Sequence, residues 1–135
     1  MIRAMRLTIG MLLLAASVTG CSSTPTRLLG ERTFQTHCAA CHGPLAEGNG
    51  PTATALRVAV PNLRSLSQRN GGEFPTDAVA RRIDGRELPA AHGTSAMPVW
   101  GPVFATTERL VSGAESPQQR IEDVIAYLRD LQYPQ

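Results

Sequence analysis

The sequence contains no lysine and few aromatic residues. All 13 of its basic residues are arginines, and phenylalanine, tyrosine and tryptophan together make up 4% of its 135 residues. A chain of this length fits one small domain, and so few aromatic side chains can fill only a thin core. Such a domain gains stability from a covalent staple or a large bound cofactor. The three cysteines, Cys21, Cys38 and Cys41, offer a way to attach one.

Acidic residues are missing from the first 20 positions, which hold Arg3 and Arg6. The formal charge of +2 therefore comes from this segment, because the remaining 11 arginines balance 11 acidic residues. The rest of the chain, residues 21–135, contains no run of basic residues interleaved with aromatics. The charge pattern thus provides no support for a nucleic-acid partner, and the absence of lysine excludes docking through a lysine ring.

The sequence also lacks an apolar run long enough to span a membrane. Residues 7–18 form a largely apolar stretch of 12 residues, whereas a spanning helix needs about 20. Residues 1–6, which include Arg3 and Arg6, form a basic segment before this stretch, and Thr19 and Gly20 follow it. This is the layout of a secretory signal. A buried first helix is the alternative interpretation. We predict a signal peptide over residues 1–20 and export from the cytoplasm.

Residues 18–21, with the sequence VTGC, resemble the lipobox of bacterial lipoproteins. There a diacylglycerol is attached to the cysteine before cleavage on its N-terminal side. The resemblance implies lipidation of Cys21, and removal of 20 of the 135 residues leaves a mature chain of 115. Two or three acyl chains suffice for stable anchoring. We expect a membrane-anchored lipoprotein that faces the periplasm, with residues 21–26 as a polar tether. If Ser22 acts as a non-acidic sorting residue, the anchor lies in the outer membrane.

Cys38, Cys41 and His42 form the pattern Cys-x-x-Cys-His, the signature of covalent c-type haem attachment. Two cysteines three apart lie on the same side of a helical turn, so both sulfurs can form thioethers along one porphyrin edge while His42 binds the iron. A thioredoxin-like pair would require a βαβ setting, which the sequence does not suggest. Zinc at these three residues, in a structural or metal-binding lipoprotein, is a further alternative, although zinc sites need four ligands.

Met97 is the only methionine outside residues 1–20. It lies in a stretch rich in proline and glycine, 55 residues after His42, and is the expected second ligand of the iron. Core packing is the alternative role for a lone methionine. His92 is the rival ligand, and a bis-histidine iron has a lower reduction potential than a His/Met iron. We expect His37 to be exposed.

These motifs make the chain from about residue 26 to its end resemble a class I cytochrome c of the bacterial monohaem type. The resemblance implies an all-α fold with crossed N- and C-terminal helices, a short middle helix, and loops that wrap one covalently attached haem. Residues 27–135 would form this domain. By resemblance, the Pro61 carbonyl accepts the other ring N–H of His42. Trp100 covers the haem or bonds a propionate, with simple core burial as the alternative.

The two later helices can be predicted from local signals. Ser116 is expected to cap the last helix, with Pro117 in its first turn and Gln119 completing a capping box. Apolar residues then recur at helical spacing, at Ile121, Val124, Ile125, Leu128 and Leu131. Residues 76–84, between Pro75 and Gly85, predict the middle helix.

The first helix and the connections complete the predicted layout. The family resemblance places Gly30 and Phe34 of the first helix against Val124 and Tyr127 of the last. Residues 43–74 lack a sustained period and are expected to form the loop around one haem edge. Residues 105–113 are expected to form a loop that leads into the last helix.

An iron bound by both His42 and Met97 has no free position for a substrate, which favours electron transfer over catalysis. We therefore expect an electron carrier rather than an enzyme, with one haem c and no small-molecule substrate. Its partners would be redox proteins such as dehydrogenase or oxidase components of a respiratory chain. The alternative is a haem enzyme subunit, or a gas- or peroxide-reactive haem protein, in which Met97 leaves the iron.

Overall fold

The structure is a computed structural model that describes residues 25–86, 97–110 and 114–134. The predicted signal peptide, Cys21 and His92 lie outside the described residues. Within the described ranges the chain forms helices and no strand, so the predicted all-α class is confirmed. The α-helices are α1 (Pro25–His37), α2 (Ala39–His42), α3 (Leu66–Arg69), α4 (Thr76–Asp84), α5 (Trp100–Leu110) and α6 (Pro117–Asp130), and short 3-10 turns cover Ala53–Ala55 and Leu63–Ser65.

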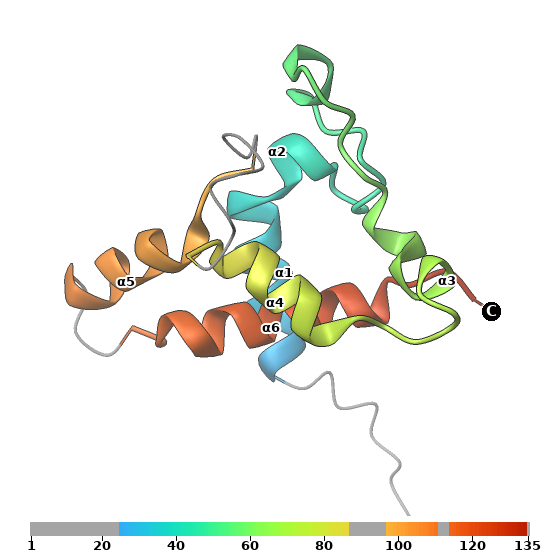
Figure 1. The fold of residues 1–135 in the computed structure, drawn as a ribbon. Helices are drawn as coiled ribbons and strands as arrows, with labels where there is room; N and C mark the ends of the chain where they lie inside the picture. Colours follow the sequence, from blue (N-terminus) through green and yellow to red (C-terminus); the bar gives the residue numbers. More distant parts are fainter. Residues whose placement is uncertain (1–24, 87–96, 111–113, 135) are drawn as a thin grey trace, which may run out of the picture.

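The first and last helices cross, as predicted, and their backbones touch (Figure 1). A Cβ atom on Gly30 would lie 1.9 Å from the carbonyl oxygen of Asp123, so only glycine fits at the crossing. Phe34 meets Tyr127, with ring centroids 5.4 Å apart. Val124, which was expected opposite the glycine, is buried beside this contact at 2% exposure. The helix pair thus brings the end of α1 against the core.

Helix α6 begins as predicted, but its capping box is only half formed. The Ser116 hydroxyl accepts a hydrogen bond of 3.1 Å from the backbone N–H of Gln119. The Gln119 side chain does not return the bond, because its Nε2 donates to the carboxylate of the buried Asp123 at 3.0 Å. Apolar residues of α6 form much of the core, whose buried members are Phe34, Ala46, Ile83, Phe104, Ile121, Val124, Ile125, Tyr127 and Leu128.

The middle helix α4 has the predicted bounds, and Gly85 ends it in the left-handed conformation at φ 72°. The prediction of a loop over residues 105–113 is wrong up to residue 110, because α5 extends through it. Two threonine hydroxyls of α5 donate hydrogen bonds to backbone carbonyls four residues earlier. Thr106 donates to the carbonyl of Pro102 at 3.0 Å, and Thr107 donates to that of Val103 at 3.3 Å. The side chain of Phe104, which lies on α5, is buried in the core, and this burial outweighs the weak helix propensity of these threonines.

The remaining segments differ little from expectation. Helix α1 begins at Pro25, inside the tether predicted over residues 21–26, since proline suits the first helical position. Residues 43–74 are mostly turns with short helices, as an aperiodic loop predicts. No helix among the described residues has the length and apolar character needed to cross a membrane.

Candidate haem site

The turn between α1 and α2 sets the spacing of the attachment residues. The backbone N–H of Cys38 bonds the carbonyl of Phe34 at 2.8 Å, and the N–H of His42 bonds the carbonyl of Cys38 at 2.9 Å. The chain therefore continues to wind past the end of α1. Cys38, Cys41 and His42 all come to line one cavity, as the predicted same-side placement requires.

This cavity has a volume of about 610 Å³ and a largely apolar lining. The volume lies within the range of about 300–1,000 Å³ that is typical of cofactor sites. Helix α4 and the segment between Leu56 and Leu66 form much of the lining, and Met97 lines the same cavity. A large flat apolar cofactor suits such a cavity, and the two thiols and the imidazole suit covalent haem attachment, so the residues present fit a haem.

His42 is buried, and burial lowers the pKa of its imidazole, while the backbone carbonyl of Pro61 opposes this by raising the pKa. The ring Nδ1 atom is buried without a hydrogen bond of ordinary geometry. A lowered pKa favours the neutral imidazole, which is the form that binds a metal. Pro61 lines the same cavity as His42, and a hydrogen bond from the His42 ring to the Pro61 carbonyl stays a prediction.

Both attachment cysteines are half-buried free thiols. Burial, and to a lesser extent the nearby Cys41, raises the pKa of the Cys38 thiol to about 12. The Cys41 sulfur lies 3.2 Å from the hydroxyl oxygen of Thr52. Zinc binds thiolates rather than thiols, and among the described residues no three His, Cys, Asp or Glu side chains are grouped to hold a metal ion. The alternative of zinc at Cys38, Cys41 and His42 therefore has no support here.

The expected second ligand and its neighbouring tryptophan both line the cavity. Met97 lies three residues before α5, and Trp100 is the first residue of that helix. The Trp100 ring stacks on Phe104 with centroids 5.8 Å apart, so Trp100 both covers the cavity and joins the edge of the core. A propionate contact for Trp100 stays a prediction.

His37 corrects one prediction. It was expected to be exposed but is half-buried, with its ring 5.3 Å from that of Trp100 and 5.6 Å from that of Phe104. Burial, and secondly the charge of Arg120, lowers its pKa. The expectation failed because the helix α5 that covers His37 was not predicted.

Sequence reasoning missed Arg82. Among the described residues that line the cavity, Arg82 is the only arginine, and none is an aspartate or glutamate. Arg82 is also exposed to solvent. It lies on α4 at positions i+4 and i+3 from Ala78 and Val79, which also line the cavity. This helical spacing is the signal that could have identified it.

The fold and the cavity define an all-α protein built to hold one covalently attached haem. The chain belongs to the cytochrome c family, whose model, described as Cytochrome c, matches residues 28–132. This family binds haem c through covalent attachment, typically one group per domain, and its members are generally electron carriers rather than enzymes. No curated protein and no solved structure matches the chain significantly.

Proposed function

We propose that this protein is a monohaem electron carrier whose iron is bound by His42 and Met97. The observation that carries the proposal is the shared lining of one cavity by Cys38, Cys41, His42 and Met97. The two cysteines would hold the haem covalently, and the histidine and methionine would bind its iron. Haem supplies a one-electron couple, and a methionine ligand raises its reduction potential.

The cavity lining supports this role in a second way. Its apolar side chains would exclude water from a bound haem iron, which would limit the reorganisation that accompanies a change of charge. Val58 lines the cavity and is 58% exposed, so the cavity reaches the molecular surface there. We propose that a redox partner, such as a dehydrogenase or oxidase component, receives or donates the electron near this edge. Transient redox contacts of this kind are small.

Carbon monoxide distinguishes the carrier from a gas- or peroxide-reactive haem protein. A stable Met97 ligand leaves no open position on the iron, so the reduced holoprotein is expected to bind carbon monoxide slowly and to exchange electrons rapidly with a small redox reagent. Stopped-flow absorbance measures both reactions. Rapid carbon monoxide binding by the resting reduced protein would instead identify a labile ligand and favour the enzyme or sensor function.

The proposed location is the periplasmic side of a membrane, with a lipid anchor at Cys21. Replacement of this residue by serine removes the acceptor for the diacylglycerol but leaves both attachment cysteines in place. We expect Cys21→Ser to yield protein in the soluble periplasmic fraction that still carries haem. Fractionation followed by a haem stain after denaturing electrophoresis tests this. A variant that stays in the membrane, or that loses haem, would contradict the proposed division of roles among the cysteines.

Arg82 would offset the negative charge of a haem propionate. Loss of its positive charge from the cavity lining stabilises the ferric form relative to the ferrous form. Arg82→Gln is therefore expected to lower the midpoint potential. The reduction free energy should change by up to about 1 kcal/mol, the size of a partly solvated charge interaction. The neighbouring Arg81 is exposed and does not line the cavity, so Arg81→Gln is the matched control. Equal potentials for the two variants would exclude this role.

A further inference from the structure

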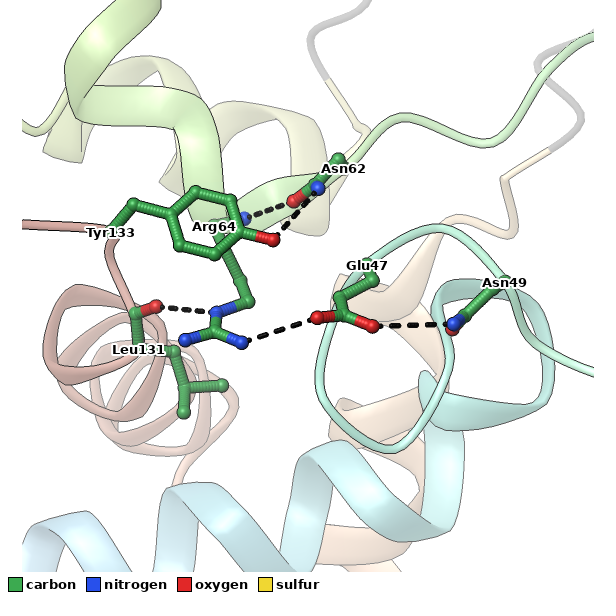
Figure 2. Close-up of polar contacts among 6 residues, drawn as sticks. All are labelled: Glu47, Asn49, Asn62, Arg64, Leu131 and Tyr133. Carbon is green, nitrogen blue, oxygen red and sulfur yellow. Dashed lines mark hydrogen bonds and ion pairs between the residues drawn. The ribbon is translucent and has the colours of Figure 1, made fainter.

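A polar cluster outside the cavity is centred on Arg64. Its guanidinium Nε donates to the carbonyl oxygen of Leu131 at 3.0 Å, and its Nη1 pairs with the Glu47 carboxylate at 3.2 Å (Figure 2). The same guanidinium lies over the Tyr133 ring, 4.4 Å from its centroid. One side chain thus joins the chain beyond α6 to the loop that follows His42.

The backbone of Arg64 is held as well. Its N–H donates to the Asn62 side-chain oxygen at 2.9 Å, and its carbonyl accepts from the N–H of Tyr133 at 2.9 Å. The Asn62 amide donates in turn to the Tyr133 hydroxyl at 3.3 Å. The segment directly after Pro61 is therefore fixed to the C-terminal segment at several points.

The loop that holds Glu47 lies against His42 and against the segment that leads into Pro61. Gly48, which follows Glu47, donates its N–H to the His42 carbonyl at 2.8 Å. A Cβ on Gly48 would lie 2.4 Å from the Val60 carbonyl oxygen, so this loop packs directly on the backbone before Pro61.

A backbone bond completes this arrangement. The N–H of Leu63 donates to the carbonyl of Ala46 at 2.8 Å and so ties the two segments to each other. Pro61, which precedes Asn62, lines the same cavity as His42, and a Cβ on Gly48 would lie 3.1 Å from the Pro61 carbonyl oxygen. A displacement of either segment would therefore move this carbonyl relative to the imidazole.

We propose that Arg64 is a positioning residue for the haem histidine, because it fixes the loop after His42 and the segment after Pro61, which together would hold the Pro61 carbonyl at the His42 ring. The inference rests on the proposed role of His42 as an iron ligand. A carbonyl that accepts from the second ring nitrogen orients a ligating histidine and raises its basicity. A more basic ligand stabilises ferric iron, so Arg64 would hold the reduction potential below the value that a freely turning imidazole would give.

Stability alone does not explain the arrangement. The Arg64 and Glu47 side chains are 26% and 32% exposed, and partly solvated ion pairs contribute little to folding. What arginine supplies here is a rigid planar fork that can bond a carbonyl and a carboxylate at once, which a lysine cannot reproduce.

The test uses the holoprotein and a charge-conserving variant. Arg64→Lys keeps the positive charge but lacks the fork, so any effect arises from geometry. In the reduced protein, NMR measures solvent exchange of the His42 ring Nδ1 proton, and we expect it to be at least tenfold faster in the variant. The midpoint potential is expected to rise. Glu47→Ala removes one of the Arg64 contacts, so the same measurements on this variant, with smaller changes expected, keep the test available if Arg64→Lys fails to fold.

Arg27→Lys is the matched control, because the Arg27–Asp130 ion pair of 2.9 Å joins α1 to α6 and involves neither Glu47 nor Asn62. It should leave ring exchange and potential unchanged. Unchanged exchange in Arg64→Lys, or equal acceleration in Arg27→Lys, would overturn the positioning role. Failure of the proposed function is separate, since a wild-type spectrum without His/Met features would show it before any variant is made.

Discussion

Replacement of Met97 by alanine is expected to lower the reduction potential by on the order of a few tenths of a volt, within the span of about 0.8 V that axial ligands set. The thioether stabilises ferrous iron, and neither water nor a protein group that replaces it does so to the same degree. Covalent haem should remain, because Cys38 and Cys41 are untouched. The charge-transfer band from thioether sulfur to ferric iron should disappear.

Absorbance during a potentiometric titration measures both effects in one sample. Val103→Ala is a suitable control, since Val103 lies on the neighbouring helix α5 and is 42% exposed. It should retain the band and the wild-type potential. If the band persists in Met97→Ala, another residue is the ligand, and His92 is the first to be tested.

Replacement of Gly30 by alanine is expected to destabilise the fold by about 3 kcal/mol, the upper part of the range for overpacked sites. The added methyl group would lie 1.9 Å from the backbone carbonyl oxygen of Asp123. A backbone atom cannot rotate away as a flexible side chain can, so α1 and α6 must separate. Separation of these helices would also disturb the turn that carries Cys38.

Guanidinium unfolding of the holoprotein, followed by far-UV circular dichroism, measures this cost. Gly71 provides the same substitution at an open position, where nothing lies within 4 Å of an added Cβ. Its positive φ of 67° still penalises alanine, by about 1 kcal/mol. A loss in Gly30→Ala no greater than that in Gly71→Ala would show that the helix crossing tolerates a side chain.

The features that were predictable from the sequence are local or chemically specific. The Pro75 and Gly85 signals bound α4, and Ser116 begins α6, because caps and breakers act within a few residues. The attachment motif at Cys38 and Cys41 is identifiable because haem chemistry requires that spacing. The contact of Phe34 with Tyr127 followed from a family resemblance rather than from either residue alone.

The features that were missed depend on contacts between distant segments. Residues 105–110 have the threonines of a loop, yet they form a helix because Phe104 is buried in the core. His37 is half-buried for the same reason. The role proposed for Arg64 depends on Glu47 and Leu131, which are 17 and 67 residues away along the chain, and no local pattern relates them.

The central claim is a single covalent haem with His42 and Met97 on its iron. Optical spectra of the purified protein in both oxidation states, together with its intact mass, test this most directly. The account predicts a mass increase of one haem, a low-spin spectrum in each state, and the thioether-to-iron band in the ferric protein. A colourless protein whose mass shows no haem, or a high-spin spectrum without that band, would contradict it.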